Sequence, residues 1–159
     1  DKNKILNIIE RINYIDNYQV SKIYPSEINI VLEKTKFISS TFIDGKKFLI
    51  GQNGKLVQAE THVNKNSIPV AYGNFKVFQL INLLDLMKKI NFDTKQITEL
   101  YFFETNRWDF VINNSILVKL PPSNLENSLK IVTGILDKSK KNKIIDLRVS
   151  NQVIINNEG

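Results

Sequence analysis

The chain has 159 residues, 42% of them hydrophobic, enough for one folded domain or one domain and a piece of another. It carries 22 basic residues, 19 Lys and 3 Arg, and a net charge of +6. The abundance of Asn and Ile beside Lys is typical of an AT-rich genome, which explains the charge more simply than nucleic-acid binding does. The absence of cysteine excludes disulfides and thiolate metal sites. No apolar run approaches the roughly 20 residues of a membrane span, and the first residues do not resemble a signal peptide, so we expect a soluble fragment or mature domain.

Residues 1 to 35 predict one helix and one hairpin. Isoleucines recur at helical spacing between positions 5 and 12, which predicts a helix ending near Asp16. Two strand-like runs follow, on either side of a turn at Pro25-Ser26. The second run alternates from Ile28 to Glu33 with the period of a half-buried strand. A unit of about 35 residues is too small to fold by itself.

The next residues predict short strands with sharp turns between them. Strands are expected at 36–43, 46–50 and 55–59, with hairpin turns at Asp44-Gly45 and Asn53-Gly54. Residues 67–74 read as a loop, with Asn74 capping a helix over 75–90.

The last third of the chain also predicts short strands, with one helix before the final hairpin. Strands are expected at 97–104, 107–112 and 115–120, the last two joined by a turn at Asn113-Asn114, and a helix is expected over 123–139. The chain then closes with a hairpin, strands 144–149 and 152–155 around a Ser150-Asn151 turn. Strands in groups with helices between them predict an α+β fold with a mainly antiparallel sheet and two packed helices. The final strand should lie at a sheet edge.

Residue patterns for catalysis are lacking. His62 is the only histidine and lies in a polar stretch, so a lone surface histidine explains it better than a triad. No His, Asp or Glu residues cluster at metal-ligand spacing. "IGQNGKL" lacks the Gly-Lys-Ser/Thr ending of a phosphate loop. "LYFFETNRW" has aromatic residues but one cation, which is weak evidence for nucleic-acid binding. We expect no enzyme activity, no metal and no cofactor.

Several motifs, in order along the chain, together resemble the bacterial cell division family FtsQ/DivIB. "VSKIYPSEINIVLEK" is similar to the pattern that closes the POTRA domain of that family. "FLIGQNGKLV", "SIPVAYGNF" and "RWDFVINNSILVKLPPSNLENSLKIVTGIL" resemble, in turn, its Leu-Ile-Asp hairpin, its Leu-Pro loop before a helix, and its Arg-x-Trp strand pair with the helix that follows. "IIDLRVSNQVIIN" resembles the closing Asp-Leu-Arg hairpin. The chain departs from the family at Gly51, where Asp is usual, at Thr35, where Pro is common, and at Ser115, where the hairpin glycine is replaced.

The resemblance implies two domains and a non-catalytic function. Residues 1–35 would be the second half of a POTRA domain, its second helix and closing hairpin, and residues 36–159 an FtsQ-type β domain. The family consists of single-pass inner-membrane proteins, anchored here by an N-terminal segment outside this chain, with this region on the periplasmic side at the septum. Its β domain binds FtsB- and FtsL-like proteins, and its POTRA domain binds other divisome proteins. Through these partners the family regulates septal peptidoglycan synthesis. Alternatives are a POTRA-type chaperone or secretion module and an envelope glycan-binding domain.

The expected partner site is the last strand, to which the partner adds a strand of its own. The resemblance and the edge position implicate Arg148, Val149, Ser150, Gln152, Val153, Ile154 and Ile155, with Arg107 as a second anchor. A guanidinium can bind a partner carboxylate bidentately, but Arg148 could instead pair with Asp146 on the same strand face. Trp108 is expected in the core, because large aromatic side chains bury so much area.

Overall fold

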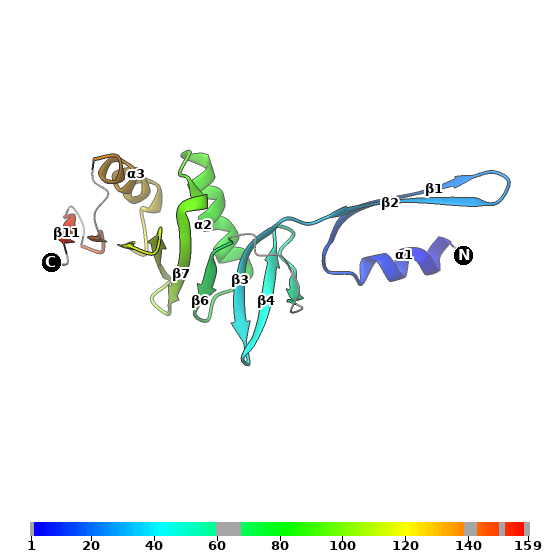
Figure 1. Ribbon diagram of the computed structural model, residues 1–159, viewed down its shortest axis with the longest axis horizontal. Helices are drawn as coiled ribbons and strands as arrows, with labels where there is room; N and C mark the ends of the chain where they lie inside the picture. The colour runs from blue at the N-terminus through cyan, green and yellow to red at the C-terminus, as the bar shows by residue number, and fades with distance from the viewer. Residues whose placement is uncertain (1, 60–67, 139–142, 150–151, 158–159) are drawn as a thin grey trace.

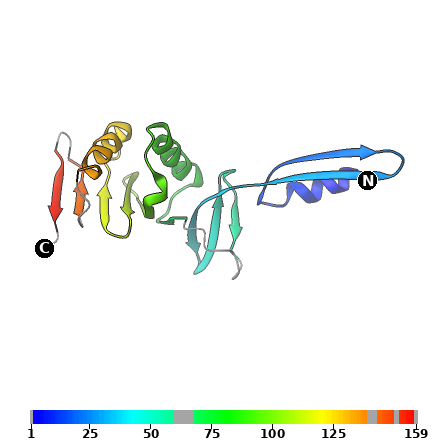
Figure 2. The same ribbon diagram turned by 45° about the horizontal axis from the view of Figure 1, so that its top comes forward.

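The computed structural model of the chain describes residues 2–59, 68–138, 143–149 and 152–157. Within these residues the fold is α+β, as the sequence predicts, with helices α1 to α3 and strands β1 to β11. Figures 1 and 2 show a small N-terminal unit that projects from one end of a large sheet, with the C-terminus near the other end. His62 lies outside the described residues.

The N-terminal unit consists of α1 (Lys2–Glu10) and the antiparallel hairpin of β1 (Ile15–Ile23) and β2 (Glu27–Lys34). The hairpin is confirmed. The predicted helix end near Asp16 is wrong, because the N–H groups of Arg11 and Ile12 bond three residues back, which tightens the chain into turns. The prediction of a half-buried strand is also wrong: every residue of β2 is exposed. Within the described residues this hairpin forms a sheet of two strands, and α1, which lies along it (Figure 1), leaves the side chains of β2 exposed.

The large sheet has nine strands in the order β11-β10-β9-β8-β7-β6-β3-β4-β5. Their bounds are β3 Phe37–Ile43, β4 Lys46–Gly51, β5 Leu56–Gln58, β6 Val70–Tyr72, β7 Ile97–Phe103, β8 Arg107–Ile112, β9 Ile116–Lys119, β10 Lys143–Asp146 and β11 Ile154–Asn157. Most neighbouring pairs are antiparallel, as predicted, but β6 runs parallel to β3 and β7, and β10 runs parallel to β9. Strand β6 corrects the prediction of a loop at 67–74. It forms because residues distant in sequence pair with it: Ser40 and Glu99 both lie opposite Val70.

Two helices, α2 (Val77–Lys89) and α3 (Leu125–Leu136), cover one face of the sheet (Figure 2). Their buried residues pack with the inward side chains of the central strands, Phe110 among them, to form the core. Trp108 belongs to this cluster and is 4% exposed, which confirms its predicted burial. The opposite face of β7, β8, β9 and β10 is called the open face below, because no helix of the described residues lies over it (Figure 2).

The helix start and the turns follow local chemistry. Lys76, rather than Asn74, precedes the first residue of α2, and its N–H donates to the side chain of Gln79 at 2.8 Å. The predicted hairpin turns are confirmed at Asp44-Gly45 and Asn113-Asn114, where all four residues have positive φ.

Candidate partner-binding edge

The last strand, β11, is one of the two edge strands of the large sheet. β11 pairs with β10 from Asp146↔Ile154 to Lys143↔Asn157, and the sheet order places no described strand beyond it. The side chains of Ile154 and Ile155 are 43% and 44% exposed. Unpaired N–H and C=O groups along a sheet edge are a ready template for another strand. The predicted edge is therefore present, with apolar side chains on it.

Hydrogen bonding on the far side of β10 determines which groups of β11 point outward. The Leu147 N–H donates to the Lys119 carbonyl on β9, so residues 145 and 147 direct their backbone groups toward β9. Successive residues of a strand alternate, so residues 144 and 146 direct theirs toward β11. Their partners, Asn156 and Ile154, complete that ladder. The N–H and C=O of Ile155, between them, face outward and remain for an added strand.

The closing hairpin is shorter than predicted. The first strand ends at Asp146 rather than Val149, because the Asp146 carboxylate accepts the Arg148 N–H at 3.0 Å and turns the chain. The second strand begins at Ile154 rather than Gln152, so Gln152 and Val153 are exposed residues just before it. Val149 is exposed and lies outside both strands, and Ser150 lies outside the described residues.

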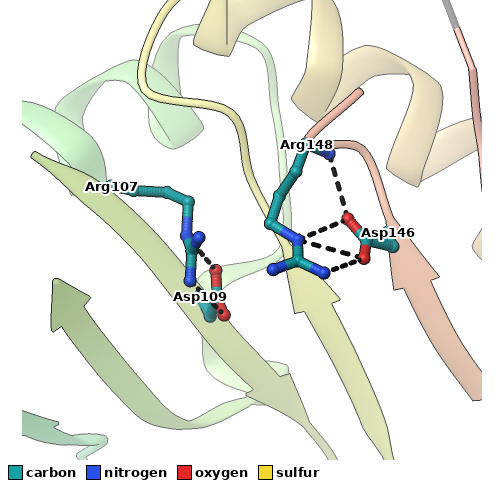
Figure 3. Close-up of polar contacts among 4 residues, drawn as sticks. All are labelled: Arg107, Asp109, Asp146 and Arg148. Carbon is teal, nitrogen blue, oxygen red and sulfur yellow. Dashed lines mark hydrogen bonds and ion pairs between the residues drawn. The ribbon is translucent and has the colours of Figure 1, made fainter. Parts of the chain in front are cut away.

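Arg148 is paired with Asp146. Its Nε donates to both carboxylate oxygens, and Nη2 donates to Oδ2 at 2.6 Å (Figure 3). The hydrogen bonds from Arg148 lower the pKa of Asp146, and the carboxylate raises the pKa of Arg148. The intramolecular pairing weighed from the sequence is therefore what the structure shows. The side chain of Arg148 is still 42% exposed, and its Nη1 takes no part in the pair with Asp146.

Arg107 forms a similar but more buried pair on β8. Its Nε lies 3.2 Å from Oδ1 of Asp109, and its guanidinium lies 4.2 Å from the centre of the Phe103 ring. Asp109 is 4% exposed. Burial raises the pKa of Asp109, although the neighbouring positive charges of Arg107, Lys119 and Arg148 act to lower it. The cations around this carboxylate therefore offset part of the free-energy cost of burying its charge.

The two arginines share one groove on the open face. The groove has a volume of about 500 Å³ and is lined by Tyr101, Phe103, Arg107, Asp109, Val111, Leu117, Lys119 and Arg148. Figure 3 shows both ion pairs on the same side of the strands. Arg107, Lys119 and Arg148 bring three positive charges to this region, and Asp109, Asp146 and Glu99, which accepts a hydrogen bond from the Tyr101 hydroxyl, bring three negative ones. The exposed guanidinium of Arg148 beside Val111 and Leu117 suits an acidic side chain next to an apolar one.

Sequence reasoning did not identify Asp109 and Lys119 as part of this site. The signal was present in "RWDFVI", where Trp108, Phe110 and Ile112 alternate inward and leave Arg107 and Asp109 on the other face. Lys119 lies opposite Asp109 and beside Asp146 in the strand registers. In the described part of the chain no three His, Cys, Asp or Glu residues could hold a metal ion together, and no helix is long and apolar enough to cross a bilayer.

Comparison with known proteins gives three findings. A family model described as "Cell division protein FtsQ/DivIB, C-terminal" matches residues 42–148. The chain is 19% identical over 152 residues to the cell division protein FtsQ of Rhizobium meliloti (strain 1021), covering 93% of this chain and 49% of that protein, so it spans about half of the relative's length. The solved structure of the major extracytoplasmic domain of the trans isomer of the cell division protein DivIB from Geobacillus stearothermophilus matches with a TM-score of 0.45 and 16% identity, covering 69% of this chain and 99% of that chain.

Proposed function

Because the chain belongs to the FtsQ/DivIB family of bacterial cell division proteins, we propose that it is a non-catalytic divisome component that acts by binding partner proteins at the β11 edge. The partners are FtsB- and FtsL-like proteins, and their binding helps to control septal peptidoglycan synthesis. The full protein is anchored in the inner membrane by a single N-terminal segment, with this region on the periplasmic side. The observation that carries the proposal is the unpaired edge of β11 beside a groove with two arginines.

The edge supplies affinity through the backbone. An added strand accepts a hydrogen bond from the outward N–H of Ile155 and donates one to its C=O. Alternate side chains of the added strand contact the exposed residues of β11. Each such hydrogen bond contributes about 1 kcal/mol net. Backbone bonds alone do not discriminate between partner sequences.

The groove supplies specificity through charge. Arg148 engages Asp146 through Nε and Nη2, so the N–H groups of Nη1 are left to bind a carboxylate of the partner. Lys119 adds a third positive charge on β9, which lies between β8 with Arg107 and β10, after whose end Arg148 follows. The partner segment is therefore acidic, with an apolar residue that contacts Val111 and Leu117 on the floor of the groove.

We also propose that residues 1–35 form the second half of a POTRA domain that recruits other division proteins. The exposed apolar residues of β2, such as Ile28 and Ile30, support this, because a hairpin with uncovered apolar side chains needs further chain to cover it. The two-residue link of Thr35 and Lys36 between β2 and β3 supports a boundary at residue 36.

The test is calorimetric titration of the chain with the extracytoplasmic C-terminal segment of the FtsB-like protein from the same organism. Ile155→Pro removes an outward N–H that the sheet does not use, and should weaken binding at least about ten-fold with the fold intact. Ile155→Ala is the matched control, since it shortens the side chain and keeps the N–H; it should bind far better than the proline variant. Ile154→Pro removes a ladder bond to β10 and should lower stability instead.

Circular dichroism and Trp108 fluorescence report whether each variant is folded. Binding of the folded Ile155→Pro protein at the wild-type affinity would show that the partner does not add a strand to β11. Failure of the wild-type chain to bind the segment at all would refute the proposed partner.

A further inference from the structure

The N-terminal unit and the large sheet meet at a small set of hydrogen bonds. Only Thr35 and Lys36 link β2 to β3 along the chain. Beside this link, the turn between β4 and β5 brings Asn53 against residues 13–15, which connect α1 to β1. A two-residue link by itself leaves two units free to rotate, so the contacts around it decide whether they do.

Asn53 lies at the centre of these contacts and uses both ends of its side-chain amide. Its Nδ2 donates to the Asn13 carbonyl at 3.1 Å and, more weakly, to the Ile15 carbonyl at 3.5 Å. Its Oδ1 accepts the Lys55 N–H at 3.1 Å, and its own backbone N–H donates to Thr35 Oγ1 at 3.4 Å. The Nδ2 amino group of Asn53 thus bonds to the N-terminal unit, while Oδ1 bonds to the turn of the large sheet. No residue other than Asn or Gln offers donors and an acceptor in this amide arrangement.

Neighbouring bonds complete the junction. Asn13 returns a hydrogen bond from its Nδ2 to the Leu56 carbonyl of β5 at 3.0 Å. The Gln52 N–H donates to the Lys36 carbonyl at 2.8 Å. The turn between β4 and β5 is therefore bonded both to the link and to the start of the hairpin, from two sides.

Gly51 makes the close approach of Asn53 possible. A Cβ at this position would lie 2.5 Å from Asn53 Oδ1 and 2.9 Å from Thr35 Cγ2. The backbone of Gly51 does not adopt a positive φ, so the conformation itself does not demand glycine. Glycine is needed because the Asn53 and Thr35 side chains occupy the space that a Cβ would take. Gly51, Thr35 and Asn53 therefore form one packed group.

We propose that Asn53 is a positioning residue that locks the α1–β1–β2 unit in one orientation against the large sheet, with Gly51 providing the space for it. The lock keeps the N-terminal unit at a constant direction from the β11 edge at the other end of the sheet. The inference concerns the junction and does not depend on which partner the edge binds.

The test measures the distance between the two units by electron–electron double resonance. The chain has no cysteine, so spin labels can be placed at Ser21→Cys on β1 and Asn82→Cys on α2, both exposed. In this labelled protein Asn53→Asp keeps an oxygen for the Lys55 N–H but sets a carboxylate against two carbonyl oxygens. The distance distribution should be narrow without the Asp substitution and clearly broader with it.

Asn114→Asp is the matched control, because it makes the same chemical change in a turn far from the junction. Equal widths with and without Asn53→Asp would overturn the proposal, and so would equal broadening in the control. Amide hydrogen exchange gives a second measurement: the Gln52 N–H should exchange roughly ten-fold faster in Asn53→Asp. Unchanged exchange at Gln52 would likewise overturn the proposal.

Asn53→Ala and Gly51→Ala keep the test decisive if Asn53→Asp fails to fold. Gly51→Ala should broaden the distribution as Asn53→Ala does, since the new methyl group displaces the Asn53 side chain. The double variant should be no broader than either single variant, because both changes remove the same lock. Additive broadening in the double variant would overturn the link between the two residues.

Discussion

Gly73, which follows β6, offers a test of how closely the sheet is packed. Its φ is +105°, and a Cβ at this position would lie 2.3 Å from the backbone oxygen of Phe102 on the neighbouring β7. The backbone strain of alanine here costs about 1–3 kcal/mol. Relieving the overlap by moving β6 away from β7 costs about 1–3 kcal/mol more. Gly73→Ala should therefore lower the free energy of unfolding by about 2–6 kcal/mol, a large part of a typical 5–15 kcal/mol.

Urea denaturation followed by the fluorescence of Trp108, the only tryptophan, measures this change. With an m-value of about 2 kcal/mol/M, a loss of about 4 kcal/mol lowers the midpoint by about 2 M. Gly134→Ala is the matched control, because its Cβ meets nothing within 4 Å inside α3. It should raise stability by about 0.5–1 kcal/mol. A Gly73→Ala protein within about 1 kcal/mol of the wild type would refute the reasoning.

Two further predictions concern charged pairs. Hydrogen bonds from Lys130 on α3 and Lys89 on α2 lower the pKa of Glu126 to about 2. The charged Glu126 carboxylate stabilises the protein above its unfolded pKa of 4.5, and this stabilisation is lost as the pH falls toward 2. Glu126→Gln should therefore destabilise the protein at pH 7 but not near pH 2. Thermal melts across this pH range measure the difference. Asp146→Asn should free Arg148 and raise the affinity for an acidic partner segment up to about five-fold in calorimetric titration, less so at high salt.

The Asp146 prediction has a matched control, and each of the two predictions has an outcome that would contradict it. Asp85→Asn removes the same charge from α2, where the carboxylate pairs with Lys88, and should leave partner affinity unchanged. Weaker partner binding by Asp146→Asn than by the wild type would show that Asp146 orients Arg148 for the partner rather than competing with it. A Glu126→Gln protein as stable as the wild type at pH 7 would show that the bridge between the two helices contributes nothing.

Local chemistry explains why the central strands and helices were predictable. Asp44-Gly45 and Asn113-Asn114 adopt positive φ at low cost, so the turns are encoded where they occur. The alternation of Trp108 with Asp109 likewise specifies the two faces of β8. The α2 and α3 helices follow from apolar spacing, and their observed bounds lie within the predicted ranges.

Strand β6 and the closing hairpin could not be read from local pattern alone. Val70, Ala71 and Tyr72 form a strand because β3 and β7 pair with them on both sides. Strand β10 stops at Asp146 because the carboxylate bonds the Arg148 N–H, a side-chain contact that competes with the predicted continuation of the strand. Likewise the alternation in β2 indicates two faces, but burial of one face depends on whether another layer covers it.

The sequence by itself determined the order and type of most elements, the edge position of the last strand and the residues that carry the family resemblance. Those features depend on backbone preference and side-chain periodicity over a few neighbouring residues. Tertiary structure alone decided that Arg107 and Arg148 share one groove, that Ile155 directs its N–H outward and that Asn53 bonds to residues 13–15. These depend on strand order and register, which join residues about 40 positions apart and which no local pattern specifies.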